Sequence, residues 1–158
     1  MYLTTTINDK NIVTAESQFN YTVYGLVNKT VYVVLDEDEE HPYYQEDILG
    51  DKITKTVSLP MLPHGAHSIK IYCTTLFGGE TKSSPILYYD LMYVEAGNNA
   101  PVIRWPYDGT ALEQYTPARF KFSVYSPVTE FVTVELIKDG EILETRQKVD
   151  RTEQFWDY

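Results

Sequence analysis

The densest group of potential metal ligands in the sequence is the acidic run Asp36–Glu40, DEDEE. Carboxylate oxygens on a loop suit Ca²⁺, which makes Asp36, Asp38 and Glu40 the calcium candidates. The run lacks the glycine of the D-x-[DN]-x-[DN]-G loop, and a solvated charged turn that blocks strand pairing explains the same residues. We therefore expect no resident metal and no other cofactor, with this run as the only calcium candidate.

The histidines and the single cysteine lack the partners that catalysis needs. Cys73 shares a strand face with Ile69 and Ile71, which predicts a buried, inert thiol. His67 follows Gly65 at a turn into this strand, and no other ligand lies at suitable spacing on it, so we expect a structural corner residue. The sequence also lacks G-x-S-x-G, H-E-x-x-H and a phosphate-binding glycine loop. These observations predict a protein that is not an enzyme.

Tyrosines supply the candidate interaction surface. The chain has 14 of them, and several gather in Pro85–Val94, PILYYDLMYV. This stretch is apolar at both parities, which predicts either a strand covered on both faces or a last sandwich strand with an aromatic outer face. Exposed tyrosines serve protein and glycan contacts. We therefore take Tyr89 and Tyr93, with Tyr43 and Tyr44 at a predicted edge, as the interaction surface.

The elements that position these residues include one predicted strand pair whose sequence pattern occurs twice in the chain. Phe19–Leu35, FNYTVYGLVNKTVYVVL, matches Phe120–Leu136, FKFSVYSPVTEFVTVEL, without a gap at an offset of 101 residues, 120 − 19. Alternating apolar residues in both copies predict neighbouring antiparallel strands. By this offset Tyr158 corresponds to Val57, so we expect the second unit to stop before its last strands. The chain is then either a fragment of a longer repeat protein or is completed by a strand from a partner.

Glycine-containing turns and a short linker divide the chain. Phe77–Glu80, FGGE, and Lys138–Glu141, KDGE, predict two-residue hairpin turns. Ala96–Pro101 is small, polar and interrupted by Gly and Pro, which is typical of a domain boundary. We predict a first domain at residues 1–96, a linker at 97–101 and a second domain at 102–158. A period near 100 residues suits units of immunoglobulin-like size.

The composition of the chain limits the possible fold classes and the possible binding partners. Net charge is −10 with a sequence pI of about 4.6, and 13 basic residues are scattered among 23 acidic ones, which argues against nucleic acid and anionic membranes. There is no run of about 18 apolar residues and no leader pattern, so we expect synthesis and retention in the cytoplasm. One cysteine excludes an intrachain disulfide. The aromatic excess suits strands rather than helices. Together with the repeat period, it predicts an all-β protein of tandem immunoglobulin-like antiparallel β-sandwiches, the second incomplete.

Several segments resemble a known kind of module. The turn and strand at Leu62–Tyr72 look like the start of strand F in bacterial and phage immunoglobulin-like modules. Leu87–Asp90, Val94–Ile103 and Val149–Trp156 resemble tandem immunoglobulin-like stretches in large structural proteins of crAss-like phages, where such modules often adjoin lectin-type domains. Ala96–Asn99 departs slightly from that linker pattern. Because no lectin-type domain is present, the resemblance implies a module type and assigns sugar binding to no residue.

Three function classes follow from the resemblance. The first is a spacer and adhesion module of a phage virion protein, in a fibre, tail or capsid appendage, made in the host cytoplasm. Its partners would be protein subunits of the virion, including further copies of itself, with host glycans bound through neighbouring domains. The second is a module of a secreted bacterial adhesin at the cell surface. The third is an accessory module of a glycan-active enzyme. All three rest on fold-level analogy.

Overall fold

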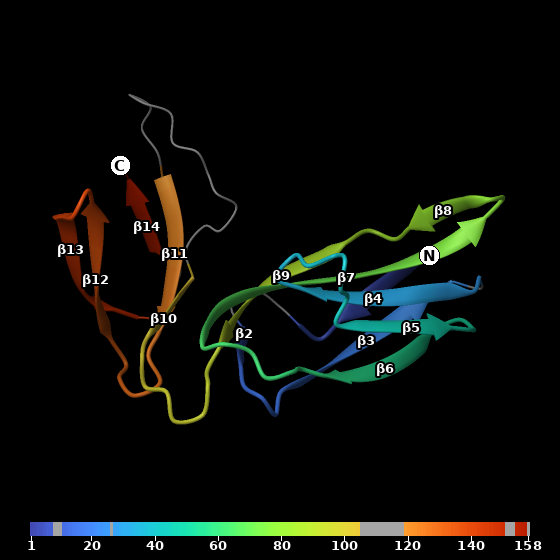
Figure 1. The fold of residues 1–158 in the computed structure, drawn as a ribbon, viewed down its shortest axis with the longest axis horizontal. Coiled ribbons are helices and arrows are strands. Elements are labelled where there is room, and N and C mark those ends of the chain that lie inside the picture. The colour runs from blue at the N-terminus through green and yellow to red at the C-terminus, as the bar shows by residue number, and fades with distance from the viewer. Residues whose placement is uncertain (8–10, 26, 105–118, 151–153, 158) are drawn as a thin grey trace. The chain divides into compact units, whose positions relative to one another are not determined.

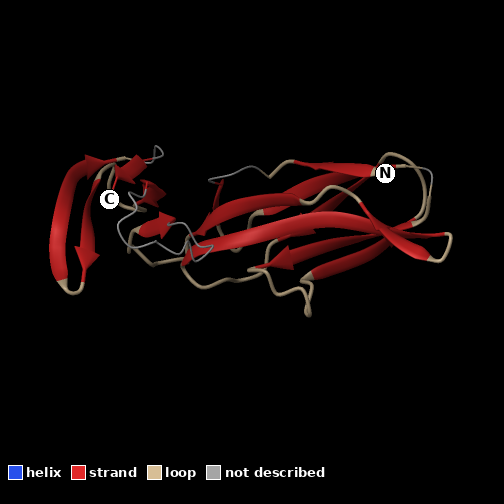
Figure 2. Cartoon of the chain, turned by 90° about the horizontal axis from the view of Figure 1, so that it is seen from above, coloured by secondary structure: helices blue, strands red, loops and turns tan. Residues whose placement is uncertain are grey.

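The protein is described here by a computed structural model that covers residues 1–7, 11–25, 27–104, 119–150 and 154–157. The described residues form strands and loops with no helix among them (Figure 2). No helix in this part of the chain has the length and hydropathy to cross a membrane. A turn that the sequence predicts at Tyr107–Thr110 lies outside the described residues.

The strands follow one another along the whole described chain (Figure 1). They are β1 (Tyr2–Thr5), β2 (Asn11–Val13), β3 (Gln18–Tyr24), β4 (Lys29–Leu35), β5 (Tyr44–Ile48), β6 (Ile53–Ser58), β7 (Gly65–Phe77), β8 (Glu80–Ser83), β9 (Leu87–Tyr93), β10 (Val102–Arg104), β11 (Arg119–Tyr125), β12 (Val132–Lys138), β13 (Glu141–Val149) and β14 (Gln154–Asp157).

Contacts between Cα atoms divide the chain into two compact units. The first unit comprises Met1–Leu62 and His67–Leu91, and the second unit comprises Pro63–Ala66 and Met92–Tyr158. The linker predicted at residues 97–101 falls within the second unit, and its role as a domain boundary stays a prediction.

The first unit is an immunoglobulin-like β-sandwich. One sheet has the order β1-β3-β6, and the other has the order β2-β9-β7-β4-β5, with β8 added to β7. The strand pairs β1–β3, β3–β6, β4–β5, β4–β7 and β7–β8 are all antiparallel. The all-β fold class is therefore the one that the sequence predicts.

The core of the first unit comes from the alternation that the sequence shows. On β3 the side chains of Phe19, Tyr21 and Val23 are buried while their neighbours are more exposed. On the facing sheet, the buried residues include Val31 and Val33 of β4 and Ile69, Ile71 and Cys73 of β7. Because successive strand residues point to opposite faces, burying this set turns the intervening residues outward. The predicted burial of Cys73 is confirmed.

The second unit repeats part of the first unit, with corresponding strands in the same order. Its sheet β10-β11-β14 has the order of β1-β3-β6, and its hairpin β12-β13 corresponds to β4-β5. Phe120 pairs with Trp156 as Phe19 pairs with Val57. The counterpart of Val57 is therefore Trp156, at an offset of 99 residues. The constant offset of 101 residues, which matched Val57 to Tyr158, is wrong here by two residues. A shorter β12-β13 connection accounts for the difference in part.

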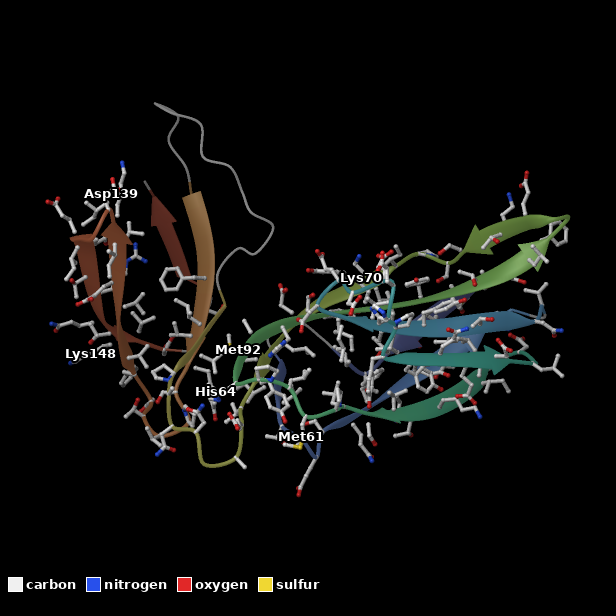
Figure 3. All side chains as sticks on the ribbon, in the orientation of Figure 1. Met61, His64, Lys70, Met92, Asp139 and Lys148 are labelled. Carbon is white, nitrogen blue, oxygen red and sulfur yellow. The ribbon has the colours of Figure 1, made fainter. Side chains whose placement is uncertain are left out.

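That shorter connection is the Asp139-Gly140 turn. Lys138 pairs with Glu141 across it, and both turn residues have positive φ, 52° and 82°, as a two-residue hairpin requires. The prediction of this hairpin is confirmed, as is that of Phe77–Glu80, where both glycines have positive φ. Figure 3 shows Asp139 at the hairpin end and Lys148 toward the other end of β13. Lys148 also has positive φ, 55°, where the β12-β13 register shifts.

His64, in the loop before β7, bonds two backbone groups of the second unit through its ring. Its Nδ1 accepts a hydrogen bond from the Glu95 backbone N–H at 3.1 Å, so its Nε2 is the atom that donates to the Ala100 carbonyl at 2.7 Å. Within the second unit, the ring therefore ties together the two sides of the turn around Gly97, whose φ is +79°.

Candidate functional site: a tyrosine face on the first unit

The outward face of the larger sheet of the first unit carries a group of aromatic side chains. Because Val31 and Val33 of β4 point inward, Tyr32 between them points outward. The same alternation turns Lys70 and Tyr72 of β7 outward, and the register places Tyr32 directly opposite Tyr72. We call Tyr32, Lys70, Tyr72 and the exposed Tyr88 of β9 the tyrosine face.

The tyrosine face is held by contacts among its own members. The rings of Tyr32 and Tyr72 stack with centroids 5.3 Å apart and planes at 21°. Lys70 Nζ donates to Glu39 Oε1 at 2.7 Å, which ties the loop Asp36–Tyr43 to the sheet. Figure 3 shows Lys70 among the side chains of this sheet. Tyr88 remains 42% exposed, and its ring is the largest apolar surface that the face offers to a partner.

The pKa shifts define the charge of the face. Burial raises the pKa of Tyr72, and the nearby Glu39 carboxylate raises it further. Burial also raises the pKa of Tyr88, although a hydrogen bond with the Ser68 side chain acts in the opposite direction. The hydrogen bond to Glu39 raises the pKa of Lys70. At neutral pH Tyr72 and Tyr88 therefore present neutral phenols and Lys70 an ammonium group, which suits hydrogen bonding and stacking rather than nucleophilic or acid–base chemistry.

The same outward face continues along β4 and β7 to a groove. Thr30 lies opposite both Asp47 and Thr74, and its hydroxyl donates to Asp47 Oδ1 at 2.7 Å. The groove has a volume of about 430 Å³ and is lined by these residues together with Leu49, which is 77% exposed, and others. Its lining of hydroxyl, carboxylate and aliphatic groups offers a polar contact area next to the aromatic one.

The structure corrects the sequence prediction for β9. Tyr93 is only 2% exposed, so it is unavailable as a surface residue, and Tyr89 is half-buried. The reason is that Leu91, Met92 and Tyr93 are all buried, which means that both faces of β9 are covered at this end. The exposed tyrosine of the strand is Tyr88. Alternation on β4 and β7 alone was sufficient to turn Tyr32 and Tyr72 outward, but their position side by side depends on a register that the sequence does not show.

Tyr43 and Tyr44 close one side of the sandwich. The Tyr43 ring is 40% exposed, and its hydroxyl donates to the Ser58 carbonyl of β6 at 2.6 Å. The Tyr44 hydroxyl lies 2.9 Å from that of buried Tyr21 and donates to Glu46. Tyr44 therefore joins the two sheets, and the prediction that it is an interaction residue is corrected to a structural role. Tyr43 keeps an exposed ring.

This buried phenol pair predicts a loss of stability at high pH. Burial and the hydrogen bond with Tyr44 raise the pKa of Tyr21 above its ordinary value of 10.0. The folded chain then holds this proton more tightly than the unfolded chain, so the stabilisation is complete below pH 10 and is lost as pH rises further. Above pH 10, the free energy of unfolding of the wild-type protein, measured with denaturant, should fall with pH more steeply than that of Tyr21→Phe. The difference in slope should be about 1 kcal/mol per pH unit. Equal slopes in both proteins would contradict this role, and Tyr2→Phe, on an exposed ring, is the control.

The calcium candidates do not form a site. Asp36 accepts from the Ser68 backbone N–H at 3.0 Å and bonds His67 Nδ1 at 2.7 Å. Asp38 pairs with His41 at 3.1 Å, and Glu40 is exposed. Among the described residues, no three or more His, Cys, Asp or Glu side chains gather in a way that could hold a metal ion. Asp36 and Asp38 instead bond to His67 and His41, and the expectation of no resident metal stays a prediction.

His67 is the nearly buried partner of Asp36. Its side chain is 10% exposed, and its bond reaches a residue 31 positions earlier. The expected structural role of this histidine is thus seen in a longer-range contact than the local corner bond that the sequence suggested. Asp36 and His67 join the end of β4 to the start of β7.

Comparisons with known proteins do not assign this chain to a family. No family model matches the chain, and no curated protein matches it. One solved structure that it is similar to is that of the fibronectin(III)-like modules of Clostridium thermocellum CbhA. The sequence identity is 12%, the match covers 98% of this chain and 77% of that chain, and the TM-score is 0.36. The assignment of an immunoglobulin-like sandwich rests on the sheet order described above.

Proposed function

We propose that this chain is a non-catalytic spacer and contact module, and that its contacts are made through the tyrosine face. The observation that carries the proposal is the outward group Tyr32, Tyr72 and Tyr88, which stands on strands of one sheet rather than on loops. Side chains fixed on strands lose little conformational freedom on binding, which favours association. Tyrosine is also enriched at the centres of protein interfaces.

The chemistry of the face favours a protein partner. Its neutral phenols and the Lys70 ammonium group lie beside the acidic residues Glu37 and Glu39, so a partner with mixed polar and apolar groups fits it best. The net charge of −10 disfavours nucleic acid and anionic membranes. We therefore take protein subunits of an assembly, including further copies of this chain, as the partners.

The assembly that we propose is a phage virion, in which the chain spaces or decorates a fibre, tail or capsid appendage after synthesis in the host cytoplasm. Support comes from the resemblance to tandem modules of crAss-like phage proteins and from the repeated unit. The alternatives are a module of a bacterial surface adhesin and an accessory module of a glycan-active enzyme. Host glycans would then be bound by neighbouring domains.

Mass spectrometry of purified particles distinguishes these assignments. A virion protein is expected at a constant copy number per particle through all purification steps. Recovery in the surface fraction of a bacterium would support the adhesin assignment instead. Recovery in one polypeptide with a glycan-cleaving domain would support the third assignment and contradict the first.

The tyrosine face itself is tested by substitution. The variant with Tyr32→Ser, Tyr72→Ser and Tyr88→Ser is expected to weaken binding to the partner subunit at least about tenfold, because each truncated tyrosine at an interface centre costs about 1 kcal/mol or more. Binding is measured by calorimetry on folded proteins. Tyr2→Ser is the matched control, since this 52% exposed ring stacks on Tyr24 in the other sheet. Unchanged affinity in the triple variant would refute the assignment.

A further inference from the structure

We propose that the groove at one end of the larger sheet of the first unit receives an arginine side chain from a partner protein. Its guanidinium group then lies on the Asp47 carboxylate, and its aliphatic stem lies against Leu49 and Leu76. This inference deepens the proposed function, because it names a side chain that the partner subunit supplies, and it rests on that function for the source of the arginine. The groove itself belongs to the first unit alone.

The floor of the groove is a row of side chains that crosses three strands. Thr30 of β4 lies opposite Asp47 of β5 on one side and opposite Thr74 of β7 on the other. At this end of the sheet β5 ends and β4 begins, beside the β7-β8 hairpin (Figure 1). Tyr32 and Tyr72 form the neighbouring row on the same outward face. Because alternate residues of a strand lie about 7 Å apart on one face, a partner segment that covers the tyrosine face reaches the groove with its next residues.

Two exposed leucines form the apolar part of the groove. Leu49 follows the last residue of β5 and is 77% exposed, and Leu76 of β7 is 73% exposed. Both line the groove together with Thr81, which pairs with Leu76 across the β7-β8 hairpin. Leucine side chains this exposed gain free energy when an aliphatic group covers them. The stem of an arginine supplies that cover while its charged end stays at the polar floor.

The polar groups of the groove have acceptor capacity to spare. Asp47 Oδ1 accepts from the Thr30 hydroxyl at 2.7 Å, and this is the one interaction of that carboxylate within the described residues. The hydroxyls of Thr74 and Thr81 make no hydrogen bond in the described part of the chain. A carboxylate accepts at about four lone-pair sites. The groove therefore favours a ligand with several donors.

The charges of the lining favour a cation over an anion. Among the described lining residues, Asp47 and Lys29 are the two that carry charge. Lys29 is buried, and its Nζ donates to the carbonyls of Gly25, Val27 and Gly50. These bonds use the donors of the ammonium group, so none is left for an anion. The net charge of −10 adds to the attraction for a cationic group.

The geometry of the carboxylate favours arginine over lysine. The bond from Thr30 fixes the Asp47 side chain on the sheet. A guanidinium group carries its N–H donors in a planar fork, so two of them can bind both carboxylate oxygens while others reach the threonine hydroxyls. An ammonium group binds as a point charge and lacks this fit. We therefore expect affinity to fall in the order arginine, lysine, citrulline, the last of which has the shape of arginine without its charge.

Titration of the full chain with three peptides tests this order. Each peptide is acetyl-Gly-Ala-X-Ala-Gly-amide, where X is arginine, lysine or citrulline, and binding is followed by backbone amide chemical shifts in NMR up to about 20 mM peptide. The arginine peptide should shift the amides of Thr30, Asp47 and Thr74, with a dissociation constant in the millimolar range. The citrulline peptide should bind about fivefold more weakly, since the loss of one exposed charge pair has an effect of about this size.

A single substitution tests the role of the carboxylate. Asp47→Asn removes the charge and keeps the size of the side chain, so it should weaken binding of the arginine peptide about fivefold, to the level of the citrulline peptide. Asp38→Asn is the matched control, because Asp38 is an exposed acid of the same unit outside the groove, and it should leave the dissociation constant unchanged. Absence of shifts at the groove, equal binding of the arginine and citrulline peptides, or an unchanged constant in Asp47→Asn overturns the proposal.

The peptide titration and the test of the tyrosine face have separate outcomes. If Asp47→Asn weakens peptide binding while the triple tyrosine variant keeps its affinity for the partner subunit, the groove assignment stands and the tyrosine face assignment fails. If Asp47→Asn leaves peptide binding unchanged while the triple tyrosine variant loses the partner subunit, the groove assignment alone fails.

Discussion

Replacing Lys29 by methionine is expected to lower the free energy of unfolding of the first unit by about 3 kcal/mol, because the substitution leaves three partly buried carbonyl groups without their charged donor. Lys29 is 3% exposed at the start of β4. Its Nζ donates to the carbonyls of Gly25, Val27 and Gly50 at 2.5, 2.9 and 2.9 Å. The ammonium group therefore holds two loops at one end of the sandwich.

Methionine retains the unbranched stem and removes only the three donors, so packing changes little. For a unit of this size the loss corresponds to a fall in melting temperature of about 15 °C. Differential scanning calorimetry measures it. Lys82→Met is the control, because the exposed Lys82 side chain on β8 forms an ion pair with the exposed Glu80. The change in unfolding free energy should stay within about 0.5 kcal/mol. Equal melting temperatures for the two variants would contradict the structural role of Lys29.

The second large effect is expected at Asp36, where alanine should cost about 2 to 3 kcal/mol. The substitution removes the hydrogen bonds to the Ser68 backbone and to His67, and it forces alanine into a positive φ of 51°. Because these bonds join β4 to β7, the first unit should lose stability as a whole.

Two further variants separate the causes. Asp36→Asn tolerates the left-handed backbone and keeps an oxygen for the Ser68 N–H, so it should cost only about 1 kcal/mol. Asp36→Gly removes the backbone strain but also the side chain, so its loss of unfolding free energy should lie between those of Asp36→Ala and Asp36→Asn. Asp38→Ala, in the same acidic loop with an exposed contact to His41, should cost no more than about 0.5 kcal/mol. If alanine at positions 36 and 38 had the same effect, the Asp36 contacts would not be what stabilises this loop. Urea unfolding curves give all four values.

The parts of the fold that were predictable from the sequence depend on local patterns. The alternation of apolar and polar residues predicted strands β3 and β4 and their copies, because burial of every second side chain is visible in consecutive residues of the sequence. Asp139-Gly140 predicted its hairpin because this dipeptide adopts the backbone conformation that the turn needs. The repeat offset predicted that the second unit would repeat the first as far as the region of Val57, although an offset taken from one strand pair missed the shorter connection that follows β12.

The parts that were missed depend on contacts between distant residues. The proximity of Tyr32 and Tyr72 needs the β4-β7 register, and the burial of Tyr93 needs both faces of β9 to be covered. Tyr44 looked like an exposed edge residue until its hydroxyl was found beside that of Tyr21. Lys29 gave no signal at all, because lysine is rarely buried and its three acceptors are backbone carbonyls that any sequence contains.

The central claim is that the tyrosine face is covered when the chain is in its assembly, and tyrosine nitration tests it most directly. In the free protein, Tyr88 should react while buried Tyr21 and Tyr93 do not, as their exposures require. In purified particles that contain the chain, Tyr88 should be protected, and Tyr2 on the other sheet should react as it does in the free protein. Equal reactivity of Tyr88 in the free protein and in the particles would contradict the account.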